Sequence, residues 1–216
     1  MNILYYDSHL LVVEKPAGIS VQPYLLDDAK AWLRRETKKE RPFLEVVHRL
    51  DRPVTGIVLF ARSSKALSRL HEMQRRRSLR KQYHALVEGE IKQQEGVLEH
   101  ALIHADHHAR VASSRDLAAK QARLHYRCIW KTEKCSALEI ELETGRYHQI
   151  RVQCAAIGHP ICGDALYGST QPYKKDAIAL QHIRLECTHP VTQETLSLQV
   201  SRSLIGKDFP WKLSHS

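Results

Sequence analysis

The chain has 216 residues, 43% of them hydrophobic, which is enough to bury a core without disulfide or metal staples. Lys and Arg number 33 against 24 Asp and Glu, and the net charge of +9 favours a polyanionic partner such as a nucleic acid. The five cysteines stand singly and form no CxxC motif, which argues against a disulfide framework and against a structural zinc site.

The N-terminal residues do not form a secretory signal, since no basic stretch is followed by a long apolar one. No apolar run reaches the length needed to cross a membrane. Because the cysteines are single, a reducing compartment fits them best. We therefore expect a soluble, cytoplasmic protein without a membrane partner.

The first half of the chain predicts two short strands, a helix, a buried strand and a second helix. Ile3–Tyr6 and Leu10–Val13 are apolar runs separated by a turn, and Pro16 and Gly18 end the second run. A helix that Asp27 and Asp28 cap is predicted next, and it runs to about Lys38. A buried strand follows at Gly56–Ala61. A second helix then begins at a Ser63 or Ser64 cap and ends at Arg75–Arg77.

The second half has period-two patterns that predict strands. After Lys81, successive side chains face opposite sides of a predicted strand. From Leu138 to Thr144, apolar residues alternate with glutamate until Gly145 ends the strand. The remaining predictions are a polar loop at Ala101–Ala112, a helix at Tyr147–Ile157 that ends before Gly158, and closing strands around Ile183–Leu185 and Leu196–Val200.

Many strands, few helices and hairpin-like spacing predict an α+β fold with a mainly antiparallel mixed β-sheet core and flanking helices and loops. No stretch has the composition of an interdomain linker. We therefore expect a single domain over residues 1–216.

The densest candidate site is the segment His48–Gly56. Asp51 lies between Arg49 and Arg52, whose guanidinium groups favour its ionised form. A carboxylate held at a strand edge can act as a nucleophile or stabilise charge. The alternative is an ordinary surface ion pair in a turn, which contributes little.

A second basic cluster, Thr144–Arg151, lies where a strand gives way to a helix. Backbone N–H groups at a helix N-terminus bind anions, and Arg146 and Arg151 add charge, although a basic terminus that merely caps itself is the alternative. His104, His107 and His108 have the residue type of metal ligands, but no cysteine lies nearby and we predict no metal site.

Read together, these segments resemble the RluA family of pseudouridine synthases. The motifs that carry the resemblance cover about residues 3 to 200 and occur in the family's order. They are Lys15–Gly18, His48–Arg52 with Thr55–Gly56, Lys81–Gly89, Thr144–Arg151, Gly158–Pro160 and Gly163–Gly168.

The resemblance implies a role for each of five residues. Asp51 would be the essential aspartate, Tyr83 would stack near the target base and act in proton removal from C5, and Arg151 would pair with Asp51 and orient it. Arg49 would enter the RNA and hold the target nucleotide out of its stack, while Ile150 would pack beside the uracil. The reaction needs no cofactor, and the site would lie in a central basic cleft.

The resemblance also implies a partner: a tRNA or rRNA stem-loop that a monomer without an obligate protein partner would modify. The S4 RNA-binding domain of many relatives does not precede the pattern, so target choice would come from the catalytic domain. Two residues depart from the family pattern. Thr55 replaces a common serine and keeps its hydroxyl, and Tyr147 stands where a smaller residue is frequent.

Two other functions stay open at this point. A non-catalytic RNA-binding protein could keep the fold, although the retained Asp51, Tyr83 and Arg151 argue against it. A glycosidic hydrolase usually needs two carboxylates around the bond, whereas this segment supplies one among arginines.

Overall fold

The structure is a computed structural model that describes residues 1–205, so residues 206–216 of the predicted 1–216 domain lie outside it. Contacts between residues divide the chain into two compact units. The first comprises Met1–Lys81, Lys175–Ala177 and His182–Val200, and the second comprises Gln82–Lys174, Ile178–Gln181 and residues 201–205. That one catalytic domain spans residues 1–216 stays a prediction.

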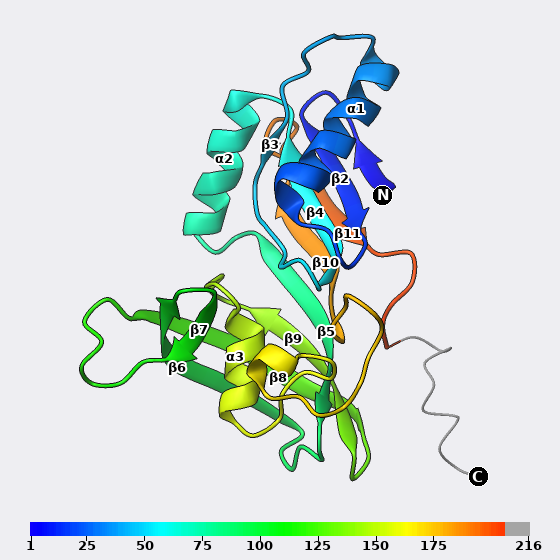
Figure 1. The fold of residues 1–216 in the computed structure, drawn as a ribbon. Coiled ribbons are helices and arrows are strands. Elements are labelled where there is room, and N and C mark those ends of the chain that lie inside the picture. The colour runs from blue at the N-terminus through cyan, green and yellow to red at the C-terminus, as the bar shows by residue number, and fades with distance from the viewer. Residues whose placement is uncertain (206–216) are drawn as a thin grey trace. The chain divides into compact units, whose positions relative to one another are not determined.

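The first unit is built on a sheet in which β1, β2, β4 and β10 are neighbours in that order (Figure 1). β3 pairs with β4, and β11 pairs with β10. The pairs β1–β2, β2–β4, β3–β4 and β10–β11 all run antiparallel. The strands are β1 (Asn2–Tyr6), β2 (Leu10–Lys15), β3 (Glu45–Val46), β4 (Thr55–Ala61), β10 (Leu180–Thr188) and β11 (Thr195–Gln199).

Helix α2 (Ser64–Arg75) packs its apolar side on this sheet. Ser63 caps it, since the Ser63 hydroxyl accepts a hydrogen bond from the Ala66 N–H. Ala66 and Leu70 are buried in one cluster with strand residues such as Leu59. Helix α1 (Leu26–Thr37) follows a short π-helical turn, η1 (Val21–Leu25).

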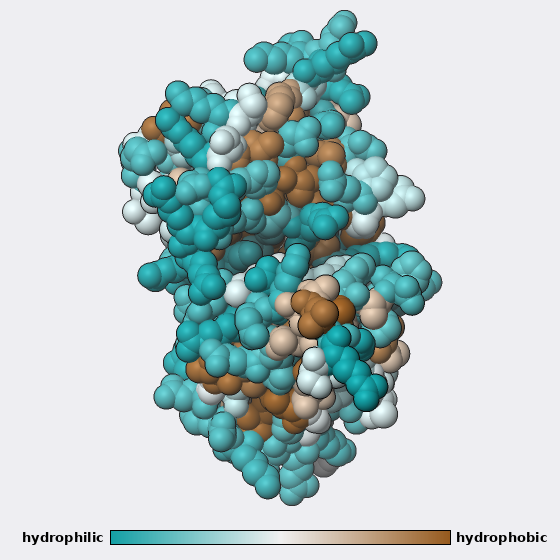
Figure 2. Space-filling model, turned by 90° about the vertical axis from the view of Figure 1, so that its left-hand side faces the viewer, coloured by the Kyte–Doolittle hydropathy of each residue, from teal (hydrophilic) through white to brown (hydrophobic). Residues whose placement is uncertain are grey.

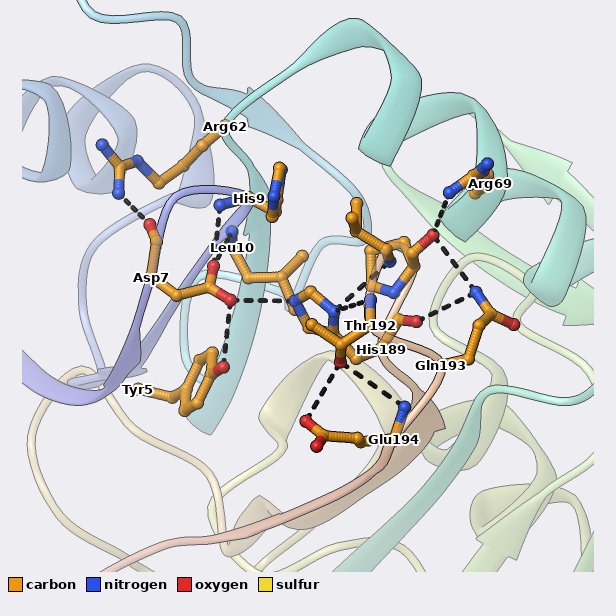
Figure 3. A network of polar contacts seen from close by, with 12 residues as sticks. Tyr5, Asp7, His9, Leu10, Arg62, Arg69, His189, Thr192, Gln193 and Glu194 are labelled. Atoms are coloured by element: carbon orange, nitrogen blue, oxygen red, sulfur yellow. Dashed lines mark hydrogen bonds and ion pairs between the residues drawn. The ribbon is translucent and has the colours of Figure 1, made fainter.

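A network of polar contacts fixes the turn between β1 and β2 (Figure 3). The Asp7 carboxylate accepts hydrogen bonds from the N–H groups of His9 and Leu10, both at 2.7 Å, and from the Tyr5 hydroxyl at 3.0 Å. His189, from the turn between β10 and β11, is buried and places Nε2 2.9 Å from the same carboxylate. One aspartate thus connects two turns that are far apart in the sequence.

The second unit is an antiparallel sheet with the order β5, β9, β8, β6, β7. Helix α3 (Gln149–Ala156) contacts β6 and β7 (Figure 1). Val152 from this helix is buried with Leu102, Ala109 and Ala122 of the sheet. The strands are β5 (Arg80–Glu88), β6 (Glu95–Ala105), β7 (His108–Val111), β8 (Lys120–Lys131) and β9 (Cys135–Leu142).

The predicted polar loop at Ala101–Ala112 is wrong. These residues form most of a β-hairpin, in which Ala105 of β6 pairs with His108 of β7. Asp106 turns the chain with a φ of 45°, a conformation that aspartate tolerates better than most residues. The alternation in the sequence is weak because only a few of these residues, such as Leu102 and Ala109, are buried.

Two predicted helices differ in their first residues. Asp27 and Asp28 lie inside the first turn of α1 and do not cap it, because Leu25 occupies the N-cap position. Helix α3 begins at Gln149 and not at Tyr147, because His148 adopts a left-handed conformation with φ 52°. The other predicted strands and the helix after Ser63 are confirmed to within a few residues.

The predicted α+β class with a mainly antiparallel sheet is confirmed. Among residues 1–205, no helix is both long and apolar enough to span a bilayer. One face of the molecule is mainly hydrophilic and is broken by smaller apolar patches, as Figure 2 shows.

Candidate active site

Asp51 stands in a tight turn directly before β4. The Val54 N–H donates to the Asp51 carbonyl at 3.0 Å, which closes the turn. A pair of hydrogen bonds joins this turn to Gly18: the Gly18 N–H donates to the Arg52 carbonyl, and Arg52 Nε donates to the Gly18 carbonyl at 2.8 Å. The carboxylate therefore stands on a backbone that a second segment braces.

The side chain of Lys15 stabilises the same turn through hydrogen bonds. Its side chain is fully buried, and Nζ donates to the carbonyls of Pro16, Ile19 and Arg52 at 2.8, 2.9 and 3.1 Å. Burial lowers the pKa of Lys15 to about 8, and the charge of Asp51 opposes that shift. A buried cation thus favours the ionised form of the nearby aspartate.

Two buried histidines and one glycine fix the start of β4. His48 Nε2 accepts a hydrogen bond from the Leu59 N–H, and the His182 ring lies edge-to-face with the His48 ring at 5.4 Å. Gly56 has a φ of 116°, and a Cβ there would lie 2.2 Å from the His182 carbonyl oxygen. Only glycine fits this approach between β4 and β10.

In the second unit, Arg151 of α3 forms a buried ion pair with Asp164. Arg151 Nε lies 2.7 Å from Asp164 Oδ2, and a second guanidinium nitrogen lies 2.8 Å from Oδ1. The side chains are 6% and 2% exposed. The guanidinium also lies over the ring of Tyr167, 5.0 Å from its centroid.

The start of α3 is organised by the side chain of Gln149. Its Oε1 accepts from the Thr144 hydroxyl at 2.8 Å and from the Arg146 N–H at 3.0 Å, while its Nε2 donates to the Arg123 carbonyl. These bonds hold residues 144–149 against β8. They place Ile150 and Arg151 on the first turn of the helix, where both are buried.

The segment that carries Asp164 is attached to β5. Ile161 bridges to Val87, and the Glu88 carboxylate accepts from the N–H groups of Thr170 and Gln171 at 2.6 and 2.8 Å. Tyr83 lies in the same strand, is 5% exposed and pairs with Ile140 of β9. Strand β5 therefore supports both Tyr83 and the Asp164 segment.

Of the five residues that the sequence singles out, Arg49 and Asp51 belong to the first unit. Tyr83, Ile150 and Arg151 belong to the second. Arg49 is exposed, whereas the three residues of the second unit are buried. The pairing of Arg151 with Asp51 stays a prediction, as do the roles of all five residues.

The structure adds three residues for which the sequence analysis predicts no role. Lys15, Asp164 and Tyr167 all lie in segments of the family resemblance, and each contacts or electrostatically influences a candidate residue. Lys15 and Asp164 are buried and Tyr167 is partly buried, and the only signal for them in the sequence is their place in the motifs of the family resemblance. Among residues 1–205, no group of three or more His, Cys, Asp or Glu is arranged to hold a metal ion.

Comparison with known proteins identifies the family. The family model for RNA pseudouridylate synthase matches residues 9–156. The ribosomal large subunit pseudouridine synthase D of Nitrosomonas europaea is 35% identical over 213 residues, which cover 91% of this chain. The tRNA pseudouridine synthase C of Vibrio parahaemolyticus is 32% identical, covering 93% of this chain and 90% of that protein.

The chain spans 60% of the length of the Nitrosomonas relative. Among solved structures, human RNA pseudouridylate synthase domain containing 4 superposes with a TM-score of 0.80 at 22% identity, over 96% of this chain and 90% of the other. Human RNA pseudouridylate synthase domain containing 1 gives 0.76 at 23% identity, over 93% and 83%. These two likenesses establish the fold, and the sequence matches establish that the chain belongs to the RNA pseudouridylate synthase family, of the RluA type that its motifs resemble.

Proposed function

We propose that the chain is an RNA pseudouridine synthase, which converts a uridine already built into an RNA to pseudouridine. The observation that carries the proposal is the family match over residues 9–156, a range that contains all five candidate residues. The braced turn of Asp51 above the buried Lys15 supports it, because the reaction needs one carboxylate held in a fixed place.

The chemistry is a rearrangement within one nucleotide. The bond between N1 of the uracil and C1′ of the ribose breaks, the uracil turns, and C5 bonds to C1′. C5 then loses its proton and N1 gains one, so no electrons or groups come from outside and no cofactor is required. The detached uracil must be held and water excluded, or the outcome is hydrolysis.

Each candidate residue has a part in this scheme. Asp51 acts at the junction of sugar and base, either by attacking the sugar or the base or by stabilising an altered sugar. Arg151 orients Asp51, Tyr83 stacks on the base and assists removal of the C5 proton, and Ile150 packs beside the uracil. Arg49, which is exposed, enters the RNA where the flipped nucleotide has left its stack.

The substrate that we infer is a structured tRNA or rRNA. The names of two relatives state that one acts on the large ribosomal subunit and the other on tRNA. The net charge of +9 supports binding to a phosphate backbone. The single cysteines fit a cytoplasmic setting, and we propose a monomer that needs no protein partner.

Tritium release tests the activity directly. Transcripts of tRNA and large-subunit rRNA carrying tritium at C5 of uridine are incubated with the wild-type chain and with Asp51→Ala. We expect release from at least one transcript with wild type and none above background with Asp51→Ala. Release that is equal for both proteins, or absent from every transcript, contradicts the proposal.

The same reactions distinguish the two alternative functions. A non-catalytic RNA-binding protein retards the transcripts in a gel but releases no tritium. A glycosidic hydrolase produces free uracil and an abasic RNA, both of which chromatography detects. The isomerase produces neither, because the uracil stays attached through C5.

A further inference from the structure

An exposed tyrosine in the second unit is held rigidly without being part of the core. Tyr147 is 44% exposed and lies between β9 and α3. Its ring stacks on the His148 ring, with centroids 3.9 Å apart and planes 18° apart, and lies edge-to-face with the His104 ring at 4.5 Å. Its hydroxyl donates to the His107 carbonyl at 3.3 Å.

Core packing does not account for this arrangement. The buried cluster beneath α3 consists of Leu102, Ala109, Ala122 and Val152, with Tyr167 packed against it. Tyr147 is not a member, and His104 is also exposed. Fixing an exposed ring costs side-chain entropy, and a ring that is already ordered binds a flat partner without that cost.

The imidazole beneath Tyr147 is neutral. The Tyr167 hydroxyl accepts a hydrogen bond from the Ala109 N–H and also hydrogen-bonds with His148 Nδ1 at 2.9 Å. Burial lowers the pKa of His148 to about 4, and the charge of Arg151 lowers it further. An uncharged ring thus supports the stack at neutral pH.

Positive charge adjoins the exposed ring. Arg146 precedes Tyr147 and is exposed, and its Nε donates to the Gln121 carbonyl at 2.9 Å. An exposed guanidinium at this position can contact a phosphate. An aromatic ring beside a cation is the combination that holds single-stranded nucleic acid.

The exposed ring is also connected to a candidate catalytic residue. Tyr147 stacks on His148, and His148 Nδ1 hydrogen-bonds with the Tyr167 hydroxyl. The guanidinium of Arg151 lies over the Tyr167 ring. A contiguous cluster of side chains therefore connects Arg151 with a base that stacks on Tyr147.

We propose that Tyr147, His104 and His148, here called the Tyr147 platform, form a stacking site for an unpaired nucleobase of the RNA substrate. The base would belong to a nucleotide near the uridine that reacts, and Arg146 would contact its phosphate. Stacking on an aromatic face tolerates any base, so the platform positions the strand and does not read its sequence. The proposal rests on the proposed function, because it names how that same substrate is held.

Fluorescence tests the stacking itself. A single-stranded oligouridylate with one internal 2-aminopurine is the probe, since stacking on an aromatic ring quenches 2-aminopurine. We expect wild type, Tyr147→Phe and Tyr147→Trp to quench the probe, and Tyr147→Ala and His104→Ala to quench it much less. Tyr24→Ala is the matched control, because Tyr24 is 65% exposed and lies in the first unit.

Steady-state tritium release separates positioning from a structural role. For Tyr147→Ala we expect KM to rise about tenfold, which corresponds to about 1.4 kcal/mol of lost stacking, with kcat and the thermal midpoint nearly unchanged. Tyr147→Phe should restore KM. A tyrosine that only stabilises the fold would lower the midpoint and kcat instead, and that result overturns the proposal.

The outcomes distinguish this inference from the proposed function. If wild type releases no tritium from any transcript, the proposed function fails, whatever the probe reports. If wild type is active but Tyr147→Ala and Tyr24→Ala both behave as wild type in KM and in quenching, only the platform fails.

Discussion

Two aspartate–arginine pairs in the second unit have nearly the same distances, but their arginines differ in exposure. Asp164 binds Arg151 at 2.7 and 2.8 Å, and Asp116 binds Arg110 at 2.7 and 2.8 Å. Both members of the first pair are buried, whereas Arg110 is 46% exposed. Removing one charge of a buried pair leaves the other charge buried with less compensation, and an exposed charge is stabilised by water instead.

We predict that Asp164→Asn lowers the free energy of unfolding by about 3 to 5 kcal/mol, because the Arg151 guanidinium stays buried. Tritium release should fall as well, since Arg151 loses the carboxylate that fixes its position. Urea unfolding followed by circular dichroism measures the stability.

The matched control is Asp116→Asn. It removes the same charge from a bidentate pair whose arginine is 46% exposed and so reaches water, and we expect a much smaller loss of stability and unchanged activity. Equal losses of stability in the two variants would show that burial does not set the energy of these pairs.

At the scale of elements, local signals that act within a few residues could be read from the sequence. Ser63 caps α2, and the continuous apolar run at Gly56–Ala61 is a strand buried on both faces. These signals are strong because a cap forms within one helical turn and because a run that is apolar throughout predicts a buried strand whichever elements cover it.

The elements that the sequence did not predict depend on tertiary contacts. The hairpin of β6 and β7 has few apolar residues, and α3 contributes Val152 to its buried side. The start of α3 is set by the contacts of Gln149 with Thr144 and Arg123. No periodicity in the sequence encodes such contacts, since their partners lie on other elements.

Gly56 provides a test at the level of one strand pair. Gly56→Ala would place a Cβ 2.2 Å from the His182 carbonyl oxygen, at a φ of 116°. The His182 carbonyl belongs to the backbone and cannot move aside as a flexible side chain can, so β4 and β10 must move apart. We expect a loss of more than about 3 kcal/mol in the free energy of unfolding, measured by urea titration.

Gly158→Ala is the control for backbone strain alone. Gly158 also has a positive φ, 82°, but nothing lies within 4 Å of the position that its Cβ would take. We expect this variant to lose about 1 kcal/mol. If Gly56→Ala is no less stable than Gly158→Ala, the close approach to His182 is not a constraint.

At the scale of the whole molecule, the candidate site could be predicted only through the family resemblance. Spacing alone left Asp51 open to interpretation as a surface ion pair, because the sequence does not place Lys15 beneath the turn. Asp164 lies in the Gly163–Gly168 motif, but the sequence does not indicate its role, since its partner Arg151 lies 13 residues away on another element. Buried charges such as these become recognisable only when the fold shows what surrounds them.

Several buried histidines also give the whole molecule a pH dependence. Burial lowers the pKa of His182 to about 3 and that of His48 well below its usual value, and the charge of Lys81 acts in the same direction. In the unfolded chain both titrate near pH 6.5. Because the unfolded state binds more protons below that pH, stability is fully present above pH 6.5 and is lost as the pH falls toward 3.

Between pH 7 and pH 5 we expect a loss of about 2 kcal/mol for each such histidine. His182→Asn removes one titrating group but keeps a donor for the Ile57 carbonyl, which His182 Nδ1 contacts at 2.7 Å. Its stability should be lower than wild type at pH 7 and should fall less steeply toward pH 5, whereas the exposed His107→Asn should follow wild type. Urea midpoints at the two pH values measure the difference. A His182→Asn variant that loses as much stability as wild type would mean that the acid sensitivity comes from other groups, such as His48 and His148, whose pKa values burial also lowers.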